Sequence, residues 1–102
     1  MTKTVFLKRD GKFCGFSVSG HSGYADAGSD IICASVSSYV NMTVALLEKS
    51  GVAIDIKTDE SIPSVTVNTK SDVADTVIGV LYECLDAVSR EYGKYLLLNV
   101  KE

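Results

Sequence analysis

Residues 20–38 read GHSGYADAGSDIICASVSS, and this stretch joins a glycine-punctuated loop to the start of an apolar helical pattern. Glycines and short polar residues break any periodicity in its first half, which is typical of a loop. Asp30 or Ser29 is a natural N-cap, and apolar residues then recur at helical spacing from Ile32 to Leu47. The nearly continuous apolar pattern predicts a central helix that is buried on most sides.

The chain before this loop is predicted to form a β-hairpin. Residues 3–8 are rich in strand-forming residues, and the Asp-Gly pair at 10–11 is a strong turn signal. Residues 12–19 alternate between an apolar face that includes Cys14 and a second face that carries serines. The pattern therefore predicts two antiparallel strands, with Cys14 in the core because a free cysteine packs like a small hydrophobic residue.

The chain after the first helix is predicted to add two strands, a second helix and a last strand. Gly51 ends the first helix, and a Ser-Asp pair at 71–72 caps the second, whose apolar stripe includes Cys84 and places that thiol in the core. The further predicted elements are strands at 52–57 and from Pro63, a helix that closes at Gly93, and a strand at 95–100.

The predicted order of elements is β-β-α-β-β-α-β. This order predicts an α+β two-layer sandwich, in which a mixed sheet carries two helices on one face. The chain has 102 residues, so we expect residues 1–102 to form a single domain. The apolar run at 96–98 indicates either a central strand or a strand whose second face is covered by a partner subunit, and a homodimer is the expected assembly.

Composition and charge exclude several classes of function. The chain is 46% hydrophobic and 23% charged, as in ordinary globular proteins, and its formal net charge is −3. This acidic balance, without a local cluster of lysine and arginine, argues against direct binding of nucleic acid. No apolar run approaches the roughly 20 residues of a membrane span, and the N-terminus lacks a signal-peptide core. We therefore expect a cytoplasmic protein that does not contact a membrane.

The cysteine and histidine counts bear on metals and disulfides. Cys14, Cys33 and Cys84 are odd in number and widely spaced, which predicts free thiols in a reducing compartment. The chain has one histidine and no Cys-x-x-Cys spacing, so we predict no metal site.

Cys33 and His21 are the residues on which a chemical function would rest. If Asp30 caps the helix, Cys33 is its third residue, where free backbone N–H groups and the helix dipole favour a thiolate and can stabilise an oxyanion. The His21 imidazole lies twelve residues earlier and can accept the thiol proton. In the alternative interpretation, Cys33 is one more core residue and His21 is a surface histidine.

Other residues of the stretch have more than one interpretation. Asp30 either serves only as the helix cap or also orients His21 as a third catalytic member. Ser37, one turn after Cys33, either hydrogen-bonds within the site or bonds back to its own helix. The loop around Tyr24 can form a flap that admits an extended peptide. The residues assigned to substrate binding are Gly20, Ser22, Gly23, Tyr24 and Gly28.

The spacing of these residues resembles that of a known family. The pattern Gly-His-x-Gly-x-Ala-x-x-Gly-x-Asp-Ile-x-Cys-Ala-x-Val-Ser, from Gly20 to Ser37, is similar to that of the ribosomal-processing cysteine proteases. The length and the order of elements are similar over the whole chain. Ser22 and Ser35 stand where alanine is frequent in that family, and both are small-for-small changes.

This resemblance implies a homodimeric cysteine protease that needs no cofactor. His21 and Cys33 would form the catalytic dyad, with Asp30 and Ser37 in supporting roles. The implied substrate is the N-terminal extension of protein twenty-seven of the large ribosomal subunit in bacteria that carry it, cut after a hydrophobic and aromatic run. Two other functions fit the same residues: a non-catalytic, ribosome-associated binding module, and a thiol redox sensor that uses Cys33.

Overall fold

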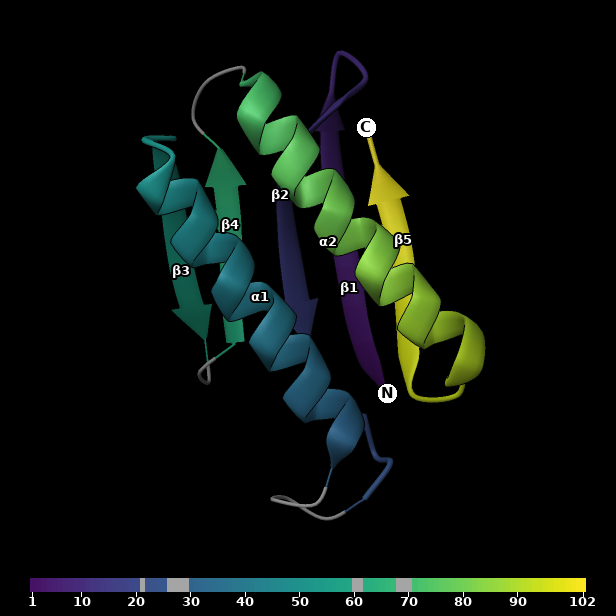
Figure 1. Ribbon diagram of the computed structural model, residues 1–102. Helices are drawn as coiled ribbons and strands as arrows, with labels where there is room; N and C mark the ends of the chain where they lie inside the picture. Colours follow the sequence, from purple (N-terminus) through teal and green to yellow (C-terminus); the bar gives the residue numbers. More distant parts are fainter. Residues whose placement is uncertain (21, 26–29, 60–61, 68–70) are drawn as a thin grey trace.

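The structure of this chain is a computed structural model that describes residues 1–20, 22–25, 30–59, 62–67 and 71–102. These residues form a five-stranded sheet with two helices packed against one face, which confirms the predicted α+β two-layer sandwich (Figure 1). The elements in chain order are β1 (Thr2–Arg9), β2 (Lys12–Ser19), α1 (Ile31–Lys49), β3 (Ile54–Asp59), β4 (Ile62–Val67), α2 (Asp72–Glu91) and β5 (Leu96–Lys101).

The sheet is mixed, and its strand order is β3-β4-β2-β1-β5. The first strand, β1, pairs antiparallel with β2 and parallel with β5, while β4 pairs antiparallel with both β2 and β3. The last strand, β5, therefore lies at the edge of the sheet, so the apolar run at 96–98 does not mark a central strand. Within that run Leu96 is buried but Leu97 is 41% exposed, because neighbouring side chains point to opposite faces.

Both helices begin at the caps that the sequence predicts. The side chain of Asp30 caps α1, and the Ser71 hydroxyl caps α2 by accepting a hydrogen bond from the Ala74 N–H at 3.1 Å. After α1 the chain turns at Gly51 with φ +76°, a conformation that glycine adopts without steric cost. The second helix ends at Glu91, two residues before Gly93, where its end was predicted.

The core lies between the helices and the sheet. Phe6 of β1 is fully buried, and its ring meets the rings of Phe13, Phe16 and Tyr82 with centroid separations of 5.1–6.2 Å. The other buried hydrophobic residues are Val18, Ile32, Val36, Val40, Leu47, Val65, Ala74, Ile78, Leu81, Leu85 and Leu96. Together with Phe6 and Phe16 they come from both helices and four of the strands, so this core fixes the helix layer on the sheet.

A β-bulge interrupts the alternation predicted for β2. Leu7 pairs with Gly15 whereas Lys8 pairs with Phe13, so Cys14 is an extra residue between the two paired positions. Phe13 packs against the core, and Cys14 is only half-buried. The prediction that Cys14 lies in the core is therefore wrong, because the bulge shifts the inward face of the strand by one residue.

Helix α1 is long and apolar enough, by length and composition alone, to cross a membrane. Its mean hydropathy reaches 1.4 over an 18-residue window, so the expectation that no run approaches such a length is wrong for α1. The core helix of a globular protein passes the same test, and in this fold the inward side of α1 is buried. The buried residues of the helix are Ile32, Val36, Val40, Thr43 and Leu47.

Candidate active site

The stretch that leads to α1 leaves the sheet at Gly20, directly after β2. Gly20 has φ +81°, and a Cβ atom there would lie 2.6 Å from the carbonyl oxygen of Met1. The Thr2 hydroxyl donates a hydrogen bond to the Gly20 carbonyl oxygen at 3.3 Å. Only glycine fits this exit without displacing the start of β1, and from here the chain leads to the N-terminus of α1.

Cys33 lies in the first turn of α1 and is half-buried. Its Sγ accepts a hydrogen bond from the backbone N–H of Ser22 at 3.4 Å. A backbone N–H that points at sulfur favours the charged thiolate over the neutral thiol. The fold therefore gives Cys33 a donor from the preceding loop as well as its position at the helix N-terminus.

Asp30 is engaged by hydrogen-bond donors at both carboxylate oxygens. Oδ1 accepts from the N–H groups of Ile32 and Cys33, each at 3.0 Å, and Oδ2 accepts from the hydroxyl of Ser22. The Ser22 hydroxyl, and after it the backbone N–H of Cys33, lower the pKa of Asp30 to about 2, and the N–H of Ala25 acts in the same direction. Asp30 is therefore a carboxylate at neutral pH and the anionic N-cap of α1.

The cap changes what the first turn of α1 can offer to a substrate. Asp30 Oδ1 takes the N–H groups of Ile32 and Cys33, and the Asp30 carbonyl oxygen accepts from Ala34 N–H at 3.1 Å. The expectation that free amides of this turn stabilise an oxyanion is thus not met for these three groups. The N–H that lies beside the sulfur belongs instead to Ser22.

Tyr24 is a loop residue whose ring contacts the C-terminal part of the chain. Its ring meets the rings of Tyr92 and Tyr95 edge-on, with centroid separations of 5.7 Å and 5.2 Å. Tyr92 caps the C-terminal end of α2, and Tyr95 directly precedes β5. Sequence reasoning did not find these two tyrosines, because only the tertiary fold brings the end of α2 beside a loop about 70 residues earlier in the chain.

Of the other predicted site residues, the structure describes Gly23 and Ser37. Gly23 is exposed with φ +74°, and Ser37 is exposed on α1 one turn after Cys33. His21 and Gly28 lie outside the described residues. Among the residues that the structure describes, no group of three His, Cys, Asp or Glu side chains could hold a metal ion.

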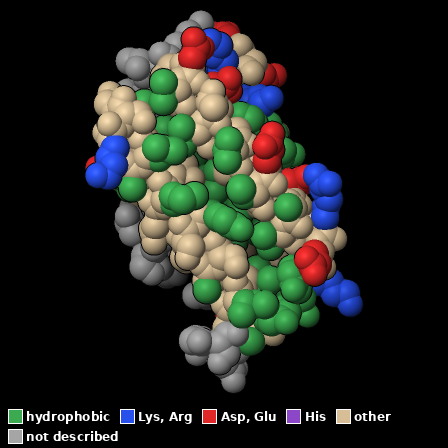
Figure 2. Space-filling model, viewed as in Figure 1, with side chains coloured by type: hydrophobic (Ala, Val, Ile, Leu, Met, Phe, Trp, Pro, Cys, Tyr) green, Lys and Arg blue, Asp and Glu red, His purple; other side chains and the backbone are tan. Residues whose placement is uncertain are grey.

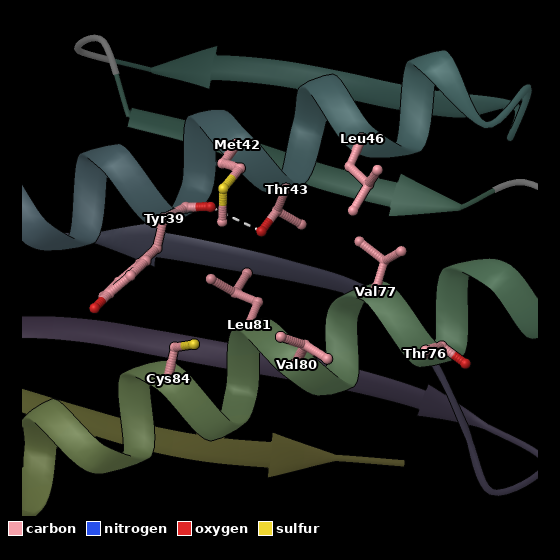
Figure 3. Close-up of a pocket in the computed structure, with 9 residues that line it drawn as sticks. All are labelled: Tyr39, Met42, Thr43, Leu46, Thr76, Val77, Val80, Leu81 and Cys84. Atoms are coloured by element: carbon pink, nitrogen blue, oxygen red, sulfur yellow. Dashed lines mark hydrogen bonds between the residues drawn. The ribbon is translucent and has the colours of Figure 1, made fainter.

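An apolar groove of about 170 Å³ runs between α1 and α2 (Figure 3). Figure 2 shows hydrophobic side chains gathered along the seam between the two helices. The Met42 side chain is 62% exposed, so the prediction that α1 is buried on most sides is wrong. Cys84 is half-buried at the groove rather than in the core, where it was predicted. The lining residues are Tyr39, Met42, Thr43, Leu46, Thr76, Val77, Val80, Leu81 and Cys84.

The site thus combines a cysteine at a helix N-terminus with a backbone donor on its sulfur, which suits a thiol nucleophile. Residues 1–97 match the family described as cysteine protease Prp, and the chain belongs to this family. The predicted class, a cysteine protease, is thereby confirmed.

Two kinds of relative extend this comparison. The ribosomal processing cysteine protease Prp of Staphylococcus aureus is 25% identical over 105 residues, with 99% of each chain covered. Crystal structures of Prp from S. aureus, one with a covalently linked product peptide and one with a substrate peptide, have TM-scores of 0.90 and 0.84 to this chain. Each is 24% identical and covers 99% of this chain and 100% of its own, so they bear out the fold.

Proposed function

We propose that this chain is a ribosomal-processing cysteine protease. Its substrate would be the N-terminal extension of protein twenty-seven of the large ribosomal subunit, cut after a hydrophobic and aromatic run. The observation that carries the proposal is the family match over residues 1–97, in a chain whose Cys33 stands at a helix N-terminus. Processing of a ribosomal protein favours a cytoplasmic location, and the net charge of −3 argues against nucleic acid as a direct partner.

In the proposed reaction Cys33 is the nucleophile and His21 is the general base. His21 takes the thiol proton, and the Cys33 thiolate attacks the scissile carbonyl carbon. The tetrahedral intermediate collapses to a thioester as His21 protonates the departing amine. Water, activated by His21, then hydrolyses the thioester and frees the thiol. The Ser22 N–H, 3.4 Å from the sulfur, supports this role because it favours the thiolate form.

The decisive experiment is cleavage of a peptide that spans the extension, followed by mass spectrometry. We expect a single cut by the wild type and no cut by Cys33→Ala or His21→Ala, while the control Cys14→Ala, a half-buried thiol on β2, cuts as the wild type does. Equal cutting by Cys33→Ala would refute the assignment of the nucleophile. Tight binding without any cut by the wild type would favour the binding module instead.

We also propose that two copies of the chain assemble through the groove between α1 and α2. Helix α1 carries no charged side chain between Ile31 and Leu47, and the exposed Met42 and Leu46 border the groove. Each copy has a net charge of −3, so two copies repel least where both present an uncharged surface. A second copy supplies a matching apolar face, as a symmetric homodimer requires.

A further inference from the structure

Ser22 is the residue that joins the loop to the nucleophile, and it is only 2% exposed. Its hydroxyl donates to Asp30 Oδ2 and accepts from the Tyr24 N–H at 3.2 Å. Its own N–H donates to Cys33 Sγ at 3.4 Å. One buried residue thus uses its side chain to fix the loop and its backbone to contact the sulfur.

We propose that Ser22 is a positioning residue for catalysis, which holds its own backbone N–H on the sulfur of Cys33. The inference rests on the proposed function, in which Cys33 is the nucleophile. The chain needs such a donor because the Asp30 carboxylate occupies the N–H groups of Ile32 and Cys33. The charge on the thiolate is then stabilised from the loop rather than by the amides that the cap occupies.

The Ser22 N–H can act on the sulfur only while the loop stays in place. A hydrogen bond to a charged group is strong but depends steeply on distance and angle. The Ser22 hydroxyl supplies the first anchor, because Asp30 is a fixed anion at the start of a 19-residue helix. Loss of this hydroxyl leaves the N–H in the chain but removes the bond that aims it.

The Tyr24 ring supplies a second anchor on the other side of the loop. Its edge-on contacts with Tyr92 and Tyr95 tie the loop to the C-terminal end of α2 and to the segment before β5. The N-terminus of α1 and the C-terminal end of α2 lie at the same end of the molecule (Figure 1). Between the two anchors the chain turns at Gly23, which has φ +74°. The loop is therefore held against both helices.

A purely structural role for Ser22 predicts a different outcome. If the hydroxyl only completes the cap of α1, its loss lowers stability and leaves the reactivity of Cys33 unchanged. If the hydroxyl aims the N–H, its loss slows the reaction of Cys33 even in a fully folded variant. Asp30 stays ionised at neutral pH because its pKa is lowered to about 2, so it contributes the same charge to every measurement in that range.

The test measures alkylation of Cys33 by iodoacetamide as a function of pH, read at the Cys33 peptide by mass spectrometry so that Cys14 and Cys84 do not interfere. For Ser22→Ala we expect the alkylation rate to fall about three- to tenfold between mildly acidic and neutral pH. The control Ser38→Ala removes an exposed hydroxyl from the same helix and should match the wild type. With the peptide substrate, kcat should fall more than KM rises.

A second variant keeps the test decisive if Ser22→Ala folds poorly. Tyr24→Ser removes the ring that anchors the loop and should slow alkylation in the same direction as Ser22→Ala, with Ser38→Ala again as the control. Wild-type alkylation by folded Ser22→Ala, or by Tyr24→Ser if Ser22→Ala does not fold, would overturn the proposal. Because alkylation needs no substrate, this result is independent of whether the wild type cuts the peptide.

Discussion

Asp30 shows how one side chain can belong to both a helix and a loop. Its Oδ1 holds the first turn of α1, and its Oδ2 accepts the hydroxyl of Ser22, which is eight residues earlier. The same contacts stabilise the charged carboxylate, since every partner is a donor. Of the two roles left open by the sequence, the geometry supplies the cap, and it adds the loop contact, which the sequence did not predict.

The lowered pKa of Asp30 predicts how stability depends on pH. The carboxyl titrates at about 2 in the folded chain, compared with 3.8 ordinarily, so its stabilising effect is complete above about pH 4 and is lost as pH falls toward 2. Asp30→Asn keeps an oxygen for the cap but does not titrate. We expect urea unfolding to show wild type more stable than Asp30→Asn near neutrality, with the difference shrinking between pH 4 and pH 2. A difference that is constant across this range would contradict the interpretation.

At the scale of elements, a hydrogen bond and an ion pair join the start of α2 to the start of β2. Asp75 Oδ1 accepts a hydrogen bond from the Phe13 N–H at 2.8 Å, and Lys12 forms an ion pair with Asp72. Phe13 directly precedes the bulge at Cys14, where the strand ladder is interrupted. Asp75 thus satisfies a backbone donor at the position where the sheet is irregular.

These two carboxylates should differ in their contribution to stability. Asp75→Ala leaves the Phe13 N–H without its charged acceptor and should lower the free energy of unfolding by roughly 1.5–3 kcal/mol. Asp72→Ala breaks an ion pair in which the Asp72 side chain is 85% exposed, and an ion pair that water surrounds contributes little to the free energy of unfolding. Urea denaturation of both variants, with Asp75→Asn as an isosteric control, makes the comparison. A larger fall in the free energy of unfolding for Asp72→Ala would show that the hydrogen bond from the Phe13 N–H to Asp75 is not the stronger contact.

At the scale of the whole molecule, the sheet and the helix layer bury one core and leave the seam between the helices apolar. Leu46 on α1 is 47% exposed and Val80 on α2 is 50% exposed, and both line the groove. The open face of β1 instead begins and ends with the charged residues Lys3 and Arg9, both exposed. The seam between the helices is therefore an apolar surface that the proposed homodimer would bury.

The proposed homodimer gives a direct prediction of mass in solution. Sedimentation equilibrium should give about twice 10.9 kDa for the wild type and shift toward 10.9 kDa for Met42→Asp, because a buried unpaired carboxylate opposes association. Val100→Asp places the same charge on an exposed apolar residue of β5 and serves as the control. A wild-type monomer, or a dimer that survives Met42→Asp and dissociates with Val100→Asp, would exclude the groove as the interface.

Much of the fold could be predicted from local sequence. The Asp-Gly turn, the period-two strands, and the caps at Asp30 and Ser71 each act over a few residues, so their effect can be read without knowing the rest of the chain. The resemblance to the protease family around Cys33 likewise rests on residue types and their spacing within one stretch of the chain. By contrast, Cys14 was misplaced, because a bulge depends on how two strands pair and not on the pattern of either one.

By itself, then, the sequence determined the order of elements, the α+β class and the protease family of this protein, since periodicity, capping residues and motif spacing are properties of neighbouring residues. Only the tertiary structure decided that the Ser22 N–H lies on the Cys33 sulfur and that Tyr24 meets Tyr92 and Tyr95. It also decided that an apolar groove lies between the two helices. The physical reason is that hydrogen bonds and ring contacts require positions in space, which only the packing of both helices on the sheet supplies.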